Sequence, residues 1–362
     1  MNKQQIKKLE GFDGIRGIAA LLVFLFHFLT LNQLDQLQAG YLNLTAFAKA
    51  GHIGLDIFFV LSGFLIFRSI YKNGMNKEYF QRRILRIAPI YYVALFVVIF
   101  LMHPDLLTNT AGRWDIFTHL LFIHSFDANT YYGINPVLWS LSVELLFYLF
   151  LPAFFILSRK KSYLILLYAI AMILGAYVYR DYMSTFNEAL DSTDKIVFTE
   201  NFIGRLDQFA FGIIASWACI KLNIENNWKK LITIVIGGIG LWLVFYGLNI
   251  FAELGGSFRE VYHLHMFLHS LIALGTALFL YAIANTYSII QKIVDNWILK
   301  FFGIISYSFY IWHFIIIEQL VNLETLSSKE IFIYSLLSVT ALSAVTYYLI
   351  EKPALAKKKY SK

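Results

Sequence analysis

Long apolar stretches, separated by short polar ones, run through almost the whole chain. A helix that crosses the hydrocarbon core of a bilayer needs about 20 mostly apolar residues. The stretches that approach this length are residues 14–31, 53–70, 88–103, 137–157, 163–179, 202–220, 231–248, 265–284, 301–317 and 331–350. The shorter segment 114–126 is expected to form a re-entrant or interfacial helix. The pattern therefore predicts an all-α polytopic membrane protein with about ten transmembrane helices.

Composition agrees with a lipid environment. Hydrophobic residues occupy 59% of the 362 positions and charged residues only 15%, whereas a soluble domain carries roughly a quarter charged residues. The first apolar stretch is expected to remain as a membrane span, because no small-residue cleavage site follows it before Asn32 and Gln33. No shift in composition marks off a soluble unit. Residues 1–362 are therefore expected to form a single transmembrane domain with no appended soluble domain.

The basic residues are distributed unevenly between the two sides that these spans define. With ten spans both ends of the chain lie on one side. That side collects 21 of the 30 Lys and Arg residues, against six in the opposite loops. Because cytoplasmic loops are enriched in Lys and Arg, both termini are predicted to be cytoplasmic. The formal net charge of +7 then reflects membrane topology, and no nucleic-acid partner is expected.

The first span carries ionisable residues that are costly in a membrane. They are Asp13 at its mouth, Arg16 and His27. An α-helix turns by 100° per residue, so Arg16 and His27 share one face and lie about 16 Å apart along the axis. One interpretation is a polar seam that lines a conduit. The other is an interfacial Asp13–Arg16 ion pair together with a histidine packed in the core.

Two further ionisable residues lie inside predicted spans. Glu144 is placed in the fourth span and His313 in the ninth, both in the outer half and at a depth comparable to that of His27. A histidine with an orienting or charged neighbour is suited to act as a general base. The sequence therefore suggests a catalytic group that includes His27 with Glu144 or His313.

A basic cluster precedes the third span on the predicted cytoplasmic side. It contains Arg82, Arg83 and Arg86, of which Arg83 and Arg86 face one way if the segment is helical. Guanidinium groups match phosphate oxygens in geometry and charge, although ordinary contact with anionic lipid is an alternative. A phosphate clamp inside and a base in the outer half would suit a long, thin donor such as coenzyme A.

Seven segments, in order along the chain, resemble the integral-membrane acyltransferase-3 family, which includes bacterial O-antigen and exopolysaccharide O-acetyltransferases. The segments are residues 9–20 with His27, 54–66, 83–89, 139–144, 205–207 with Gly212, 306–313 and 350–353. The fourth-span segment departs from some members, since Glu144 is followed by Leu145 where those members have a second glutamate. The resemblance covers essentially the whole chain.

This resemblance implies an O-acyltransferase that takes acetyl from cytoplasmic acetyl-CoA to an extracytoplasmic glycan or glycolipid, in the bacterial inner membrane and without a metal. It implies a catalytic role for His27 with Arg16, and CoA-phosphate contacts for Arg83 and Arg86. The expected site residues, taken together with those named above, are Asp13, Arg16, His27, Glu144 and His313 for catalysis, Arg82, Arg83 and Arg86 for the donor, and Asp56, Trp139 and Arg205 for the substrate.

Several alternatives stay open at this stage. The acceptor is expected to be lipopolysaccharide O-antigen or another surface polysaccharide, with peptidoglycan or a secreted small molecule also compatible. A secondary transporter or flippase would use intramembrane Arg, His and Glu as a substrate and proton path. A third alternative is a non-catalytic structural component of the envelope, but that role would not explain the ionisable residues inside the membrane. Oligomeric state is not indicated by the sequence.

Overall fold

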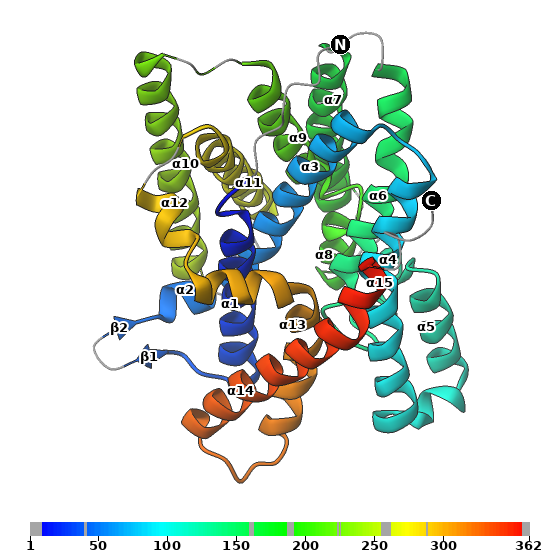
Figure 1. Cartoon of the computed structure of the whole chain (residues 1–362). Helices are drawn as coiled ribbons and strands as arrows, with labels where there is room; N and C mark the ends of the chain where they lie inside the picture. The colour runs from blue at the N-terminus through cyan, green and yellow to red at the C-terminus, as the bar shows by residue number, and fades with distance from the viewer. Residues whose placement is uncertain are drawn as a thin grey trace.

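The computed structural model describes residues 9–39, 42–158, 163–186, 192–222, 224, 226–254, 262–286 and 289–356. Within them the chain forms a bundle of tilted helices (Figure 1). The long helices are α1 (Phe12–Leu31), α3 (Gly54–Asn73), α4 (Lys77–Val97), α6 (Trp139–Ser158), α7 (Tyr163–Asp181), α9 (Leu206–Lys221), α10 (Asn227–Leu254), α11 (Tyr262–Asn285), α13 (Trp297–Val321) and α14 (Ser328–Thr346). The π-helical segments Val98–Met102 and Tyr347–Glu351 extend α4 and α14.

Shorter elements connect the long helices. They are α2 (Thr45–Lys49), α5 (Thr110–Leu120), α8 (Ser192–Glu200), α12 (Ile289–Val294) and α15 (Lys352–Ala356). A minimal antiparallel ribbon pairs β1 (Gln38–Ala39) with β2 (Leu42–Asn43) between α1 and α2. The predicted all-α fold is thus confirmed for the described residues, with this ribbon as a small addition.

Each of the ten predicted spans coincides with one of the long helices. Among the described residues, eight helices are long and apolar enough to cross a membrane. The other two are α6, whose shorter apolar part is Trp139–Leu151, and α9, which has only 16 residues. The chain is therefore a multi-pass membrane protein.

Glycines allow the central helices to approach one another closely. A Cβ atom at Gly303 of α13 would lie 1.7 Å from the backbone oxygen of Asp13, and one at Gly17 of α1 would lie 2.2 Å from that of Leu299. Gly63 of α3 meets α9 in the same way. Small residues at helix crossings give membrane helices their van der Waals contact. The packing fixes α1 against α13, and these two helices carry several of the predicted site residues.

Helix α5 turns back into the membrane. The hydroxyl of Tyr91 on α4 donates to the carbonyl of His119, and that of Tyr92 donates to the carbonyl of Leu120, each at 2.9 Å. Tyr92 precedes Met102, the end of the α4 span, by ten residues, which is about 15 Å of helix. The end of α5 therefore lies well inside the span of α4, as a re-entrant helix and not an interfacial one.

This re-entrant segment also sets the depth at which α6 begins. The Phe122 ring stacks on Tyr91 with ring centroids 4.0 Å apart, and the Phe122 carbonyl accepts a hydrogen bond from the Ser142 hydroxyl at 2.5 Å. The first turns of α6 are thus level with the middle of α4. Irregular backbone at membrane depth is tolerated where protein buries it, and Tyr131 and Asn135 of this segment are both buried.

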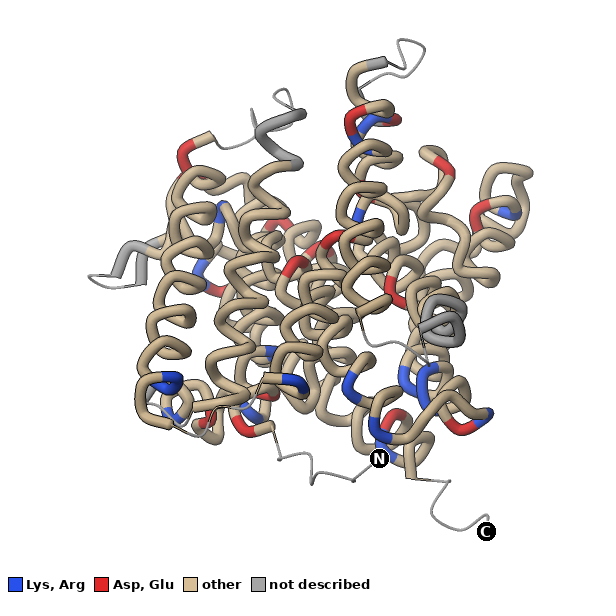
Figure 2. The backbone as a smooth tube through the Cα atoms, turned by 90° about the horizontal axis from the view of Figure 1, so that it is seen from above, with Lys and Arg blue, Asp and Glu red and all other residues tan. Residues whose placement is uncertain are grey.

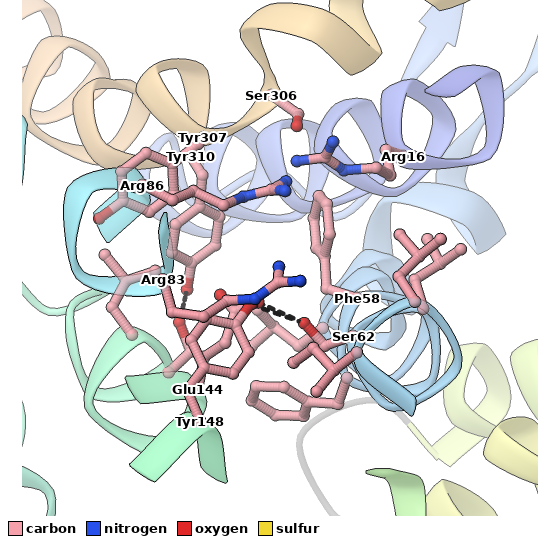
Figure 3. Close-up of a pocket in the computed structure, with 17 residues that line it drawn as sticks. Arg16, Phe58, Ser62, Arg83, Arg86, Glu144, Tyr148, Ser306, Tyr307 and Tyr310 are labelled. Atoms are coloured by element: carbon pink, nitrogen blue, oxygen red, sulfur yellow. Dashed lines mark hydrogen bonds between the residues drawn. The ribbon is translucent and has the colours of Figure 1, made fainter. Parts of the chain in front are cut away.

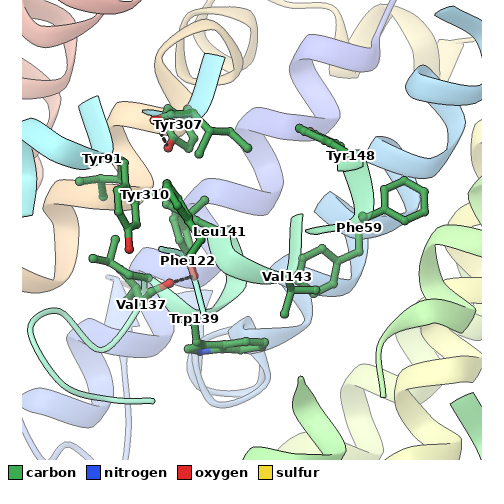
Figure 4. Packing of buried hydrophobic residues seen from close by; sticks show 14 of the residues in the cluster. Phe59, Tyr91, Phe122, Val137, Trp139, Leu141, Val143, Tyr148, Tyr307 and Tyr310 are labelled. Carbon is green, nitrogen blue, oxygen red and sulfur yellow. Dashed lines mark hydrogen bonds between the residues drawn. The ribbon is translucent and has the colours of Figure 1, made fainter. Parts of the chain in front are cut away.

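Aromatic side chains make up much of the largest buried cluster. Phe59 of α3, Tyr91 of α4, Trp139 of α6 and Tyr310 of α13 meet there (Figure 4). Close-packed protein interiors have low compressibility. This cluster therefore holds the four helices in fixed relative positions.

Lys and Arg residues gather along one edge of the bundle, the lower edge in Figure 2, and fewer lie toward the opposite edge. That asymmetry accords with the positive-inside pattern. The predicted cytoplasmic placement of both termini concerns residues 1–8 and 357–362, which lie outside the described ranges.

Candidate functional site

A partly open cavity lies between α1, α3, α4, α6 and α13, and its empty volume, which includes space open to solvent, is about 640 Å³ (Figure 3). Its wall combines apolar side chains with basic, hydroxyl and carboxylate groups. The lining residues are Arg16, Leu55, Phe58, Phe59, Leu61, Ser62, Leu65, Ile66, Arg83, Arg86, Ser140, Leu141, Glu144, Tyr148, Ser306, Tyr307 and Tyr310.

Three arginines from two helices, Arg16, Arg83 and Arg86, line this cavity. The Arg83 guanidinium lies 5.7 Å from the ring centroid of Tyr79 and 5.4 Å from that of Tyr148. Its Nε is buried and makes no hydrogen bond within the described ranges. Cation–π packing orients the group and leaves its N–H donors for a ligand.

The other predicted basic residues differ in their surroundings. Arg16 forms a long ion pair with Asp13, with 3.8 Å between Nη1 and Oδ1. Each interpretation of the first span therefore describes part of what is observed. Arg16 forms the ion pair with Asp13, and it also lines the cavity. Arg82 is exposed and does not line the cavity.

Glu144 is the one carboxylate among these lining residues, all of which belong to the described part of the chain. It accepts hydrogen bonds from the hydroxyls of Ser62 and Tyr148, whose oxygens are 3.0 Å apart. Arg16 and Arg86 lie close enough to attract its charge. Glu144 is thus held by two hydroxyl donors and two arginines.

His27 and His313 meet at one end of α1 and α13. His27 Nδ1 and His313 Nε2 are 2.9 Å apart, and His313 Nδ1 lies 2.6 Å from the carbonyl of Tyr310. A carbonyl only accepts, so His313 Nδ1 carries the proton and its Nε2 accepts from His27 Nδ1 when both rings are neutral. The remaining nitrogen, His27 Nε2, is then an unprotonated acceptor on a half-buried ring.

The structure separates Glu144 from this histidine pair. Glu144 forms no hydrogen bond with His27 or His313, all three being described residues, and belongs to the arginine cavity instead. The expectation of comparable depth assumed that the fourth span begins at the outer surface. Because α6 begins at the end of the re-entrant segment, Glu144 lies deeper than its position in the sequence indicates.

Tyr310 connects the cavity with the histidines. Its ring lines the cavity, and its hydroxyl lies 2.7 Å from the Ser140 hydroxyl and donates to the Val137 carbonyl at 2.8 Å. Its own carbonyl is the group that His313 Nδ1 contacts. The histidine pair therefore lies one turn of α13 away from a residue that lines the arginine cavity.

The three predicted substrate residues form a second buried cluster. Arg205 Nη1 is 2.9 Å from Asp56 Oδ1, and the Arg205 guanidinium lies 6.0 Å from the ring centroid of Trp139. His269 Nδ1 is 2.7 Å from Asp56 Oδ2, and Glu200 Oε2 is 2.7 Å from Arg205 Nη2. The charges of Asp56 and Arg205 are thus compensated within the protein.

Several of these contacts were not anticipated from the sequence. Ser62 and Tyr148 were missed because a serine and a tyrosine in apolar helices carry no pattern of their own. His269 was missed because its partner Asp56 is 213 positions away in the sequence. Glu200 lies close to Arg205 in the sequence but outside the predicted spans, where an acidic residue is ordinary. His269 lies inside the predicted span 265–284. The criterion that selected His313, an ionisable residue within a span, would therefore have selected His269 as well.

A search of family profiles supplies an independent comparison. The profile described as an acyltransferase domain matches residues 9–350. The chain belongs to the acyltransferase-3 family. The match extends from the residues before α1 to the last turn of the α14 extension, so the arginine cavity and the histidine pair both lie within the family domain.

Known proteins that resemble this acyltransferase-3 chain are acetyltransferases by name. A candidate acetyltransferase of Acidianus two-tailed virus is 27% identical over 84% of this chain and 82% of its own length. A candidate O-acetyltransferase of Staphylococcus aureus is 25% identical over 97% of this chain, which spans 58% of that protein. The peptidoglycan O-acetyltransferase of Listeria monocytogenes is 32% identical over 42% of this chain and 25% of its own length. No solved structure matches the chain.

Proposed function

We propose that this acyltransferase-3 protein is an O-acyltransferase of the bacterial cytoplasmic membrane. It moves an acetyl group from cytoplasmic acetyl-CoA to a hydroxyl of an extracytoplasmic glycan, such as lipopolysaccharide O-antigen or another surface polysaccharide. Residues 1–362 act together as one transmembrane acyltransferase domain. The observation that carries the proposal is the intramembrane cavity in which Arg16, Arg83 and Arg86 converge on a space lined by only one carboxylate among the described residues.

The cavity is suited to an anionic donor. Ionised groups away from water are costly unless they are paired, and Arg83 packs on two tyrosine rings and forms no ion pair with a carboxylate in the described part of the chain. Phosphate oxygens would pair with this guanidinium, and arginine presents its N–H donors in a geometry that phosphate accepts. The pyrophosphate and 3′-phosphate of CoA are such groups. Arg83 and Arg86 are the proposed phosphate contacts.

The distance from arginines to histidines suits the extended arm of the donor. Eleven residues separate Arg16 from His27 on α1, which is about 16 Å at 1.5 Å per residue. With the phosphates at the arginines, the pantetheine arm would follow α1 and α13 past Tyr310. The thioester would then lie beside His27, and the acceptor would approach from the opposite side of the membrane.

His27 Nε2 is the proposed general base. It takes the proton of the acceptor hydroxyl while the oxygen attacks the thioester carbonyl, and the resulting imidazolium returns that proton to the departing CoA thiolate. An ester and CoA–SH are the products. His313 Nε2 and the Val23 carbonyl both accept from His27 Nδ1–H, and together they hold the reactive tautomer. Asp56, Trp139 and Arg205 remain the proposed acceptor-side residues, and Asp13 and Glu144 balance the charge of the donor cavity.

The names of the relatives add one candidate acceptor for the same acetyl-transfer reaction. One of them is named for peptidoglycan, so a peptidoglycan hydroxyl belongs beside O-antigen and other surface polysaccharides as an acceptor to be tested. Each is a sugar hydroxyl on the outer side of the membrane.

The decisive experiment uses membranes that contain the wild-type protein or His27→Ala. They receive labelled acetyl-CoA and envelope glycans, and alkali-labile ester is measured on each glycan. We expect ester with the wild type only. Ester formation of near-normal rate with His27→Ala would refute the assignment of the base. No ester and no CoA release across a panel of donors and glycans would favour a transporter.

A further inference from the structure

Glu351 is a buried carboxylate at the end of the last long helical segment. It closes the π-helical turn Tyr347–Glu351 and is only 4% exposed. Its carboxylate accepts a hydrogen bond from the Ser308 hydroxyl on α13. A buried carboxylate is costly without a compensating partner, so this position requires more than one neutral hydroxyl donor.

The compensating partners are two arginines of the donor cavity. Glu351 attracts Arg86 of α4 and Arg16 of α1, and the segment that bears it contacts α4 directly. Arg16 and Arg86 line the cavity, whereas Glu351 is not among the lining residues. It therefore acts on the cavity from behind the arginines.

A second contact fixes this arrangement. Tyr307, which precedes Ser308, lines the cavity and donates its hydroxyl to the carbonyl of Ile87 at 2.7 Å. Ile87 directly follows Arg86. Tyr307 therefore binds the backbone next to Arg86, while the adjacent Ser308 binds the carboxylate of Glu351. These two bonds keep Glu351 close to Arg86.

The arginines need such a counter-charge. The guanidinium groups of Arg16 and Arg86 are turned toward each other across the cavity (Figure 3), and each repels the other. Like charges at close range separate unless a carboxylate lies near both. Glu144 supplies one negative charge from inside the cavity, the exposed Asp13 pairs with Arg16 at 3.8 Å, and Glu351 supplies a buried charge from outside the cavity.

We propose that Glu351 is a positioning residue for the acyl donor. It keeps Arg16 and Arg86 together at the cavity wall, in the arrangement that receives the phosphate groups of acyl-CoA. This inference rests on the proposed function. Glu351 does not touch the donor and takes no part in bond making, so its loss affects donor binding and leaves the rate at saturating donor nearly intact.

The test is CoA binding to the purified, detergent-solubilised full chain, measured by titration calorimetry. Glu351→Gln removes the charge and keeps the side-chain volume. We expect its Kd for CoA to rise about tenfold, comparable to the loss of one hydrogen bond to a charged group. Acetyl transfer at saturating acetyl-CoA should stay within about twofold of the wild type.

Three further variants separate positioning from general disturbance. Glu351→Asp retains the charge and should recover most of the binding. Ser308→Ala removes only the hydrogen bond to Glu351, so it should weaken CoA binding in the same direction but less. Glu318→Gln changes a partly buried carboxylate of α13 away from the cavity and should bind CoA as the wild type does.

The outcomes are distinct. CoA binding by folded Glu351→Gln that equals or exceeds wild-type binding overturns the inference and leaves the proposed function standing. If Glu351→Gln does not fold, CoA binding by Ser308→Ala that equals wild-type binding overturns it instead. Absence of CoA binding by the wild-type protein overturns the proposed function, and the role of Glu351 with it.

Discussion

At the scale of single residues, one hydrogen bond joins two histidines that are 286 positions apart in the chain. The direction of that bond follows from the Tyr310 carbonyl, which compels His313 Nδ1 to be a donor. That bond, together with the Val23 carbonyl 3.1 Å from His27 Nδ1, leaves His27 Nε2 as the accepting nitrogen. The sequence pointed to both histidines because ionisable residues in spans are rare, but the direction of proton donation required their geometry.

Replacing His313 tests this arrangement. In His313→Ala the His27 ring loses one of the two acceptors of its Nδ1–H and keeps the Val23 carbonyl. The ring is then less firmly oriented, and we expect kcat for acetyl transfer to fall by about 10- to 100-fold, less than the full general-base contribution of about 10²–10⁴. His313→Gln offers a side-chain oxygen that can accept from His27 Nδ1 and should recover part of the rate. Equal rates for His313→Ala and the wild type would remove His313 from the mechanism.

The arginines of α4 should act on donor affinity. Arg86→Ala deletes charge-assisted hydrogen bonds to phosphate, each of about 1.5–3 kcal/mol, so we expect the KM for acetyl-CoA to rise about 10- to 100-fold. Arg86→Lys keeps the charge without the planar fork and should lie between the two. Arg82→Ala is the matched control, since Arg82 is exposed and outside the cavity. A similar rise in KM for Arg82→Ala would show that general surface charge, not the cavity, attracts the donor.

At the scale of helices, apolar length placed all ten predicted spans on observed helices, because a bilayer requires long apolar segments of satisfied backbone. The segment 114–126 was also recognised as different. The sequence left open whether that segment is re-entrant or interfacial, and it did not reveal that α6 begins at depth. Hydropathy reports length and polarity but not the level at which a helix starts, so Glu144 was placed too close to the outer surface and too close to the histidines.

Helix contacts set the geometry of the site, and the contact at Gly303 offers a direct test of them. A Cβ atom there would lie 1.7 Å from the backbone oxygen of Asp13, so Gly303→Ala must push α1 away from α13. We expect a loss of about 1–3 kcal/mol of stability, read as a lower Tm of the detergent-solubilised protein, together with weaker CoA binding. Gly238→Ala is the control because a Cβ there meets nothing within 4 Å. Equal Tm values for both variants would contradict the close α1–α13 contact.

At the scale of the whole molecule, the account requires that the arginine end of the cavity faces the cytoplasm. Lys77 at the start of α4 and Thr108 beyond its far end are both exposed. In a Cys219→Ser background, Thr108→Cys should react with a membrane-impermeant maleimide in intact cells. Lys77→Cys should react only after the membrane is opened. The reverse pattern would invert the topology and place the donor cavity on the wrong side for cytoplasmic acyl-CoA.

The central claim is that one cavity receives the donor from one side of the membrane and delivers its acyl group to the other. Sealed inverted vesicles that enclose envelope glycan test it most directly, with labelled acetyl-CoA supplied only outside, at the former cytoplasmic face. The account predicts alkali-labile label on the enclosed glycan with the wild-type protein, and none with His27→Ala. Label that appears only when donor and glycan share one side of the membrane would contradict it.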